Sequence, residues 1–138
     1  MGRQNFLGNH LNPSQHQFWA EDVTQALRQL AARRECFDMV VIDPPSSSRS
    51  KTSGHFSVKR DLGKLVRAAA PLVKKGGCLF GSTNLADWKS EAFCRALEES
   101  IHFSKRKIVE KVWTPQPSDF PVTTIRPAHL KSIWFRLE

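Results

Sequence analysis

The clearest hydrophobic pattern in the chain is the unbroken apolar run Met39–Ile42, which is rich in β-branched residues. Its length and composition predict a strand that is buried on both faces. A second apolar run, Cys78–Ser82, predicts another strand of this kind. Two later strands are expected at Lys107–Trp113 and Ile133–Leu137, and a short early one at His16–Ala20.

Apolar residues at helical spacing fall between these runs and predict three amphipathic helices. Their stripes are Val23, Ala26, Leu27 and Leu30, then Leu62, Leu65, Val66 and Ala69, and finally Trp88, Ala92, Phe93, Ala96, Leu97 and Ile101. Asp22 is expected to cap the first helix. Asn84 or Asp87 is expected to cap the third. The last turns of an additional helix are expected within residues 1–14.

The alternation of strands and helices predicts an α/β sheet with an antiparallel end. The 138 residues show no internal repeat and no linker, so we expect a single unit with one core. Residues 46–57 carry six serines and one glycine among charged side chains, which predicts a flexible loop.

The composition argues against a membrane-spanning protein, a disulfide framework and a cysteine metal site. No apolar run approaches the ~18 residues of a membrane-spanning helix. The three cysteines, Cys36, Cys78 and Cys94, are odd in number and far apart. They predict reduced thiols in a cytoplasmic protein and neither a disulfide framework nor a metal site.

The net charge of +8 is unevenly distributed along the chain. Basic residues dominate from Arg49 to Lys75, where Asp61 is the only acid. Such a cluster can be merely a solvated face. It begins, however, in the loop after Asp43-Pro44-Pro45, the residues that follow the Met39–Ile42 strand, and this position favours a phosphate-rich partner such as nucleic acid.

Asp43, Pro44 and Pro45 follow the first buried strand. The two prolines prevent further strand pairing and stiffen the exit. In an open α/β sheet, ligands bind at the carboxyl ends of the strands, so Asp43 is a candidate binding residue. The alternative is a buried strand that simply stops at a turn.

The succession from Asp43-Pro44-Pro45 through the serine-rich stretch to Ser82-Thr83-Asn84 resembles class I S-adenosylmethionine-dependent methyltransferases. The similarity is greatest to the branch that methylates large-subunit ribosomal RNA. It implies a truncated Rossmann-like sheet of about five strands, with helices on both faces and an antiparallel C-terminal strand pair. It covers only the later part of the family's domain. The glycine-rich cofactor loop has no counterpart, because no two of the seven glycines form a Gly-x-Gly pair.

The resemblance also implies roles for particular residues. It places Asp43, Pro44, Pro45 and Asn84 in a pocket for the target base, Asp22 and Val23 against the adenine of S-adenosylmethionine, and Arg49, Lys51, Lys59 and Arg60 on RNA. Asp22 can equally be a plain helix cap. Ser46 stands where amine methylators often have an aromatic residue, and Cys78 lies inside a strand as an inert thiol. Both features favour attack by a ring nitrogen, as in 7-methylguanosine formation.

Three hypotheses remain open at this level. In the first, the chain binds RNA but has no complete cofactor site when alone. In the second, it is a working RNA methyltransferase that completes its cofactor pocket through a second chain or uses a different donor loop. In the third, it is a non-catalytic RNA-binding or protein-interaction module. Loss of the family's first two strands would expose the edge of the Met39–Ile42 strand. We therefore expect His16–Ala20 to pair with that strand, or a homodimer or second chain to cover it.

Overall fold

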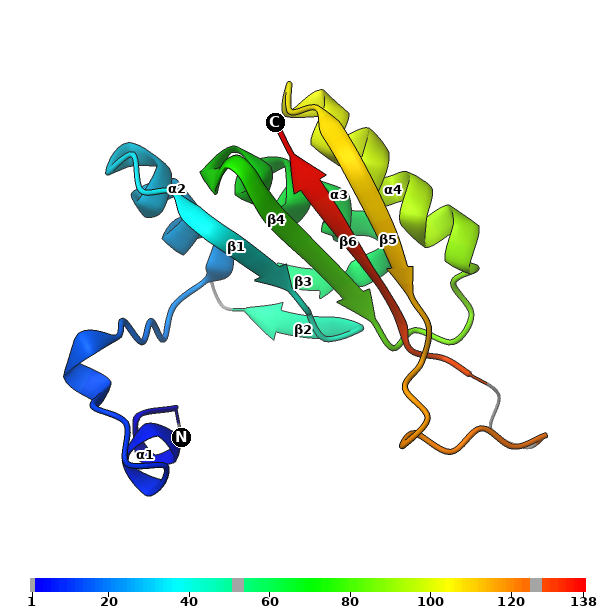
Figure 1. Ribbon diagram of the computed structural model, residues 1–138, viewed down its shortest axis with the longest axis horizontal. Coiled ribbons are helices and arrows are strands. Elements are labelled where there is room, and N and C mark those ends of the chain that lie inside the picture. Colours follow the sequence, from blue (N-terminus) through cyan, green and yellow to red (C-terminus); the bar gives the residue numbers. More distant parts are fainter. Residues whose placement is uncertain (1, 51–53, 125–127) are drawn as a thin grey trace.

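The fold is built on a four-stranded mixed sheet (Figure 1). The computed structural model describes residues 2–50, 54–124 and 128–138. The strand order is β1-β4-β6-β5, with bounds Phe37–Ile42, Val73–Thr83, Lys131–Leu137 and Ile108–Thr114 in that order. β1 and β4 are parallel, and β6 is antiparallel to both β4 and β5. The predicted α/β class with an antiparallel C-terminal pair is confirmed.

The remaining elements are helices and a hairpin. The α-helices are α1 (Gly2–Gly8), α2 (Val23–Ala32), α3 (Val58–Ala69) and α4 (Ser90–Phe103), the 3-10 turns are η1 (Pro13–Gln15) and η2 (Ala70–Leu72), and the hairpin strands are β2 (Ser47–Ser50) and β3 (Gly54–Ser57). The three amphipathic helices predicted from apolar spacing correspond to α2, α3 and α4. None of the described helices is long and apolar enough to cross a membrane.

The core lies between one face of the sheet and the helices α3 and α4 (Figure 1). Alternate residues of β6, namely Ile133, Phe135 and Leu137, point into it and are almost fully buried. They belong to the same buried cluster as Phe93 and Leu97 of α4, which are also fully buried. α2 packs against α3. The sequence predicts helices on both faces, but in the described part of the chain α2, α3 and α4 group together.

The predicted strand at His16–Ala20 does not form; the segment is irregular. Its apolar side chains pack on α1 instead, where the ring of Phe6 lies 4.6 Å from His16 and 5.1 Å from Phe18. The segment therefore stays away from the sheet (Figure 1). With this strand missing, the sheet has four strands where about five were expected, and β1 is its terminal strand.

The prediction of a flexible loop is also wrong for Ser47–Ser50 and Gly54–Ser57, whereas residues 51–53 of that stretch lie outside the described residues. β2 and β3 form an antiparallel hairpin in which Ser47 pairs with Ser57 and Arg49 with His55. Gly54, at φ +75°, adopts the left-handed conformation as β3 begins. Phe56 packs against the core and anchors the hairpin. Backbone pairing and one aromatic anchor order a segment whose composition is typical of a loop.

β4 begins five residues earlier than the predicted Cys78 because it contains a bulge. Phe37 pairs with Val73, and the next pair is Met39 with Cys78. Gly76 has φ +77°, and a Cβ on Gly77 would lie 2.8 Å from the carbonyl oxygen of Asp38. The glycine pair therefore allows β4 to bulge while its backbone approaches β1 closely.

The predicted helix caps have mixed outcomes. The Asp22 carboxylate accepts a 2.9 Å hydrogen bond from the Thr24 N–H and caps α2 as expected. Asn84 and Asp87 do not cap α4, whose N-cap is Lys89 without a side-chain hydrogen bond. The loop before α4 is held by other contacts, described below, so α4 starts without a polar cap.

Candidate base and cofactor site

The parallel strands β1 and β4 end at the same edge of the sheet, where Ile42 pairs with Gly81. This register brings Asp43, just after β1, beside Ser82 near the end of β4. The Ser82 hydroxyl donates a 2.5 Å hydrogen bond to Oδ1 of Asp43. Ser82 is buried and Asp43 is exposed. The buried Ser82 hydroxyl therefore fixes the orientation of the Asp43 carboxylate, and the carboxylate remains accessible to solvent.

A second hydrogen bond joins the loops that follow the two strands. The Ser46 hydroxyl donates to Oδ1 of Asn84 over 2.8 Å. Pro44 and Pro45 lie between the two bonded positions and restrict the backbone there. Since Oδ1 of Asn84 is used as an acceptor, its amide N–H groups are left to meet another acceptor. The structure thus brings Asp43, Pro44, Pro45 and Asn84 together, as the sequence predicts.

The loop that carries Asn84 is fixed by a buried lysine. Lys131, the first residue of β6, is 6% exposed. Its ammonium donates to the carbonyl oxygens of Leu85 (2.9 Å) and His129 (3.0 Å), and burial lowers its pKa. Lys59 of α3 holds the same loop through a 2.9 Å ion pair with Asp87. The loop that follows β4 is therefore held from two separate elements, β6 and α3.

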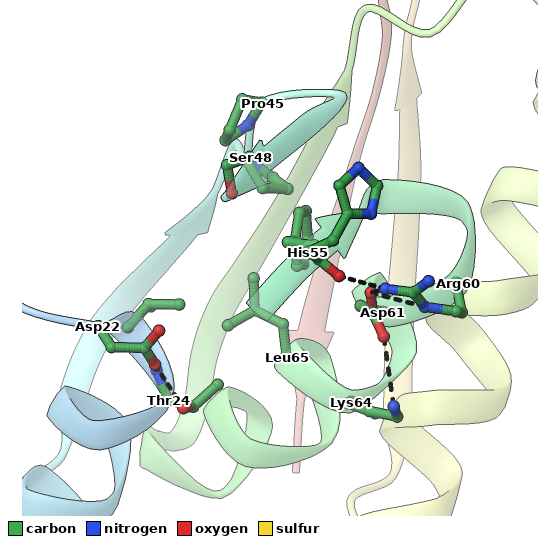
Figure 2. A pocket seen from close by; sticks show the side chains of 12 residues that line it. Asp22, Thr24, Pro45, Ser48, His55, Arg60, Asp61, Lys64 and Leu65 are labelled. Carbon is green, nitrogen blue, oxygen red and sulfur yellow. Dashed lines mark hydrogen bonds and ion pairs between the residues drawn. The ribbon is translucent and has the colours of Figure 1, made fainter. Parts of the chain in front are cut away.

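A cavity of about 480 Å³ opens beside these loops (Figure 2). Its walls are the start of α2, the proline pair, the β2–β3 hairpin and the first turns of α3. The lining residues are Asp22, Val23, Thr24, Pro44, Pro45, Ser48, His55, Phe56, Arg60, Asp61, Lys64 and Leu65. The volume and the mixture of apolar walls with a few polar groups are typical of a small-molecule site.

Asp22 and Val23, the residues predicted to contact adenine, both line this cavity. Asp22 caps α2 at the same time, because its Oδ1 also accepts from the Thr24 hydroxyl at 2.5 Å. The prediction that Asp22 caps a helix is confirmed. Its contact with adenine stays a prediction, and its place on the cavity wall is compatible with that role. Val23 is 48% exposed and offers an apolar surface at the cavity mouth.

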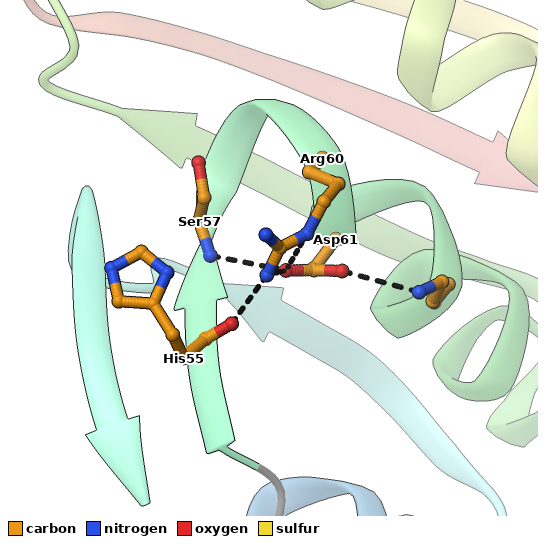
Figure 3. A network of polar contacts seen from close by, with 5 residues as sticks. His55, Ser57, Arg60 and Asp61 are labelled. Carbon is orange, nitrogen blue, oxygen red and sulfur yellow. Dashed lines mark hydrogen bonds and ion pairs between the residues drawn. The ribbon is translucent and has the colours of Figure 1, made fainter.

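The opposite wall of the cavity is a network centred on Asp61 (Figure 3). Its carboxylate lies 2.7 Å from Arg60, 3.2 Å from Lys64 and 3.0 Å from the Ser57 N–H. Hydrogen bonding to Arg60 contributes most to a pKa of Asp61 well below the ordinary value. Arg60 also donates to the carbonyl oxygen of His55 and so ties β3 to α3.

The four residues predicted to contact RNA have different surroundings. Arg49 is exposed on β2, and no described carboxylate lies within ion-pairing distance of it. Lys59 and Arg60 are paired with Asp87 and Asp61, so their charges are partly neutralised. Lys51 lies outside the described residues. Arg49 is thus the best placed of the described three to meet a phosphate.

Two features of the site were missed in the sequence. Lys131 shares the buried face of β6 with Ile133 and Phe135 by simple alternation, and this period-2 pattern was the available signal. The hairpin residues Ser48, His55 and Phe56 gave no signal, because their segment has a loop-like composition. Among the described residues, no group of three or more His, Cys, Asp or Glu side chains could hold a metal ion.

The cysteines do not supply a nucleophile at this edge. Cys78 lies within β4, four residues before Ser82. Cys94 of α4 is half-buried, and desolvation together with the nearby Glu98 raises the pKa of its thiol to about 11. A protonated thiol is a poor nucleophile.

Comparison with known proteins decides what this arrangement resembles. No family model matches the chain. The ribosomal RNA large subunit methyltransferase K/L of Legionella pneumophila is 38% identical over 88 residues, which are 63% of this chain and 12% of that protein. Methyltransferase K of Neisseria meningitidis is 36% identical over 84 residues, which are 60% of this chain and 24% of that protein.

A solved methyltransferase structure agrees. The protein SMU.776, crystallised with SAH, superposes with a TM-score of 0.81 at 28% identity over 96% of this chain. The predicted resemblance is confirmed. The chain is similar to one part of an S-adenosylmethionine-dependent methyltransferase. It spans 34% of the length of SMU.776, and a smaller share of the Legionella and Neisseria proteins.

Proposed function

We propose that this methyltransferase-like chain provides the base-binding side of an RNA methylation site and has no complete S-adenosylmethionine site when alone. The observation that carries this proposal is the pair of hydrogen bonds, Ser82 to Asp43 and Ser46 to Asn84, which join the loops after two parallel strands. The relatives are named ribosomal RNA methyltransferases, and we take RNA as the substrate class from those names.

The exposed carboxylate of Asp43 accepts from an amine or ring N–H on the edge of an unstacked base. Asn84 supplies amide N–H groups for the acceptors of the same base. Together they select a base by its edge once it has left the helical stack. The prolines restrict the loop, so the two polar groups are positioned before the base arrives.

The transfer itself needs little acid–base chemistry from the protein. In such a transfer the lone pair of a ring nitrogen would displace the sulfur from the methyl carbon, so that an N–C bond would replace the S–C bond and the positive charge would pass from the sulfonium to the base. S-adenosylmethionine supplies the methyl group when bound. The absence of an aromatic residue at Ser46 and of a cysteine beside Asn84 supports a ring nitrogen as the acceptor.

The cavity beside Asp43 fits part of the cofactor. Val23 and Leu65 offer apolar walls for an adenine, and Asp22 places a carboxylate at its rim. The same 138 residues contain no Gly-x-Gly turn to hold the methionine portion. We therefore assign Asp22 and Val23 to one side of a cofactor site whose other side lies outside this chain.

RNA is the proposed partner, and the cytoplasm is the proposed location. The net charge of +8 and the exposed Arg49 beside the site support binding to phosphates. The three cysteines are free, as expected for a reducing compartment. In this proposal residues 1–138 form a single partial domain of the methyltransferase type.

Two titrations test this proposal. Ribosomal RNA should bind with an affinity that falls steeply with salt concentration. S-adenosylmethionine should show no saturation at concentrations that saturate the whole Legionella relative in the same buffer. RNA binding that is absent even at low salt would overturn the base-binding side, and saturable cofactor binding would overturn the incomplete site.

A non-catalytic module is the second candidate. The missing Gly-x-Gly turn favours it, because a relic that binds RNA or protein needs no methyl donor. Under this candidate, Asp43→Asn leaves RNA affinity unchanged, since the pocket is then unused. A loss of affinity in that variant supports the base-binding function instead.

A further inference from the structure

The segment between β5 and β6 lies at the same edge of the sheet as the base-binding loops. Thr83, which ends β4, pairs with Lys131, which begins β6. β5 ends beside the same point, because Thr114 pairs with Ser132. The segment therefore leaves and rejoins the sheet next to the loop that follows β4 (Figure 1). Its described residues are 115–124 and 128–130.

The side chain of Gln116 holds this segment in shape. Its Oε1 accepts from the backbone N–H groups of His129 and Leu130, each over 3.0 Å. Its Nε2 donates to the carbonyl oxygen of Phe120 over 3.4 Å. The Phe120 N–H in turn donates to the carbonyl oxygen of Pro117 over 3.0 Å and closes a turn. The backbone at Phe120 is therefore held at both its N–H and its carbonyl group.

Hydrogen bonds also connect this turn to the candidate base site. The buried ammonium of Lys131 donates to the carbonyl oxygen of His129 and to that of Leu85. Leu85 directly follows Asn84, one of the proposed base-binding residues. Phe120 therefore has a fixed place relative to the loop that carries Asn84.

The exposed surface of the segment is apolar and has no cation. Phe120 is 50% exposed and Val122 is 56% exposed. Residues 115–124 contain three prolines and no lysine or arginine, and Asp119 directly precedes Phe120. A phosphate would meet a carboxylate here and no cation, so this surface suits the uncharged face of a base better than the RNA backbone. The prolines restrict the chain in advance, which lowers the entropy lost on binding.

We propose that the ring of Phe120 stacks on an unpaired base that flanks the target base in the RNA. This inference rests on the proposed function, because a base that enters the pocket at Asp43 must leave its stack. Its departure exposes the faces of the neighbouring bases. Aromatic side chains commonly cover such faces in complexes with single-stranded RNA, and the contact tolerates any base.

RNA affinity at several salt concentrations tests this proposal. The probe is the tightest-binding member of a set of fluorescent single-stranded fragments that together span large-subunit ribosomal RNA. Phe120→Ala should weaken binding by about 5- to 100-fold and leave the slope of log affinity against log salt unchanged, because stacking releases no counterions. Phe120→Leu, which is apolar but has no ring, should lose most of the affinity, and Phe120→Trp should keep it. In the Trp variant, RNA should quench the fluorescence that the added indole contributes.

Two controls separate stacking from other effects. Phe103→Ala removes a ring that is 75% exposed at the far end of α4, and it should bind RNA like the wild type. Annealing a complementary strand to the probe pairs its bases, so the wild type and Phe120→Ala should then bind the duplex equally. Thermal unfolding of each variant shows that it is folded.

The outcomes distinguish this inference from the proposed function. If the wild type binds no fragment at low salt, both are overturned. If the wild type binds and Phe120→Ala binds equally well, this inference alone is overturned, and the exposed ring is then left to a protein partner or to none. A smaller salt slope in Phe120→Ala, or the same loss of affinity on the duplex, would also overturn it, because the contact would then not be stacking on an unpaired base.

Discussion

The Ser82 hydroxyl lies 2.5 Å from the Asp43 carboxylate, although the two residues are 39 positions apart in the sequence. The contact exists because β1 and β4 are parallel neighbours that end together. It fixes the direction of a carboxylate that remains exposed to solvent. A carboxylate held in this way can accept from an amine or a ring N–H of a base, which is the role that we propose for Asp43.

Asp43→Asn should weaken RNA binding by about tenfold to a hundredfold, because a hydrogen bond to a charged acceptor is worth roughly 1.5–3 kcal/mol. The measurement is fluorescence anisotropy with a ribosomal RNA fragment. Asp38→Asn is the matched control, since Asp38 is 87% exposed at the opposite end of β1. Equal affinities for the two variants would contradict the assignment of Asp43.

Arg49→Ala should weaken RNA binding through the loss of one phosphate contact. The slope of log affinity against log salt should fall by about 1. Lys75→Ala removes a comparable charge at the far end of β4, where the side chain is 78% exposed, and should leave the slope unchanged. If the slope falls in the Lys75 variant and not in the Arg49 variant, the RNA binds at the end of the sheet where β4 begins, and not beside Arg49.

Asp61→Asn should destabilise the fold by about 1–2 kcal/mol at neutral pH, since it weakens the bonds to Arg60, Lys64 and the Ser57 N–H. The pKa of Asp61 is lowered on folding. Its contribution is therefore complete above the ordinary value near 3.8 and is lost as pH falls below it. The free energy of unfolding, measured with urea, should differ less between the variant and the wild type at pH 3 than at pH 7. Asp119→Asn, in the exposed segment after β5, is the control.

Lys131→Met should loosen the loop that carries Asn84. Burial lowers the pKa of Lys131, so the unfolded chain holds this proton more tightly than the folded one. Stability from this group therefore rises with pH on approach to the ordinary value of 10.5. The variant should lose that rise and should show faster hydrogen exchange at Leu85 and Trp88. If the pH dependence of stability and the exchange rates are both unchanged in the variant, Lys131 does not hold this loop in place.

Gly77→Ala should cost roughly 1–3 kcal/mol, because the added methyl group would overlap the Asp38 carbonyl and force the bulge of β4 away from β1. Gly8→Ala is the control: a Cβ there meets no atom within 4 Å. Thermal unfolding of the two variants measures the difference. A Gly77 variant as stable as wild type would show that β4 can shift at this position.

The elements that apolar periodicity marks could be predicted. The β-branched run in β1 and the apolar run in β4 are enough to define strands, and the stripe from Leu62 to Ala69 defines α3. The grouping of Asp43 with Asn84 was implied by the methyltransferase resemblance, and in the structure it follows from the parallel pairing of β1 with β4. Periodicity does not encode whether a segment pairs with the edge of a sheet. For this reason His16–Ala20 was wrongly predicted as a strand.

Two parts of the site depend on tertiary context. The β2–β3 hairpin is built from serine, arginine and histidine pairs, and its order comes from Phe56 in the core and from Arg60 holding the His55 carbonyl. Lys131 is charged, and its burial follows from two carbonyl oxygens that meet it after folding. The partners of the hairpin and of Lys131 are distant in sequence, so no local pattern identifies them, although the alternation along β6 does place Lys131 on the buried face.

The most direct test of the account is isothermal titration of the purified chain with S-adenosylmethionine, run beside the whole Legionella methyltransferase. The account predicts that the relative saturates while this chain shows no saturation at the same concentrations. Comparable saturation of the chain alone would mean that it holds a complete donor site, and the division into a base-binding half and a missing donor half would be wrong.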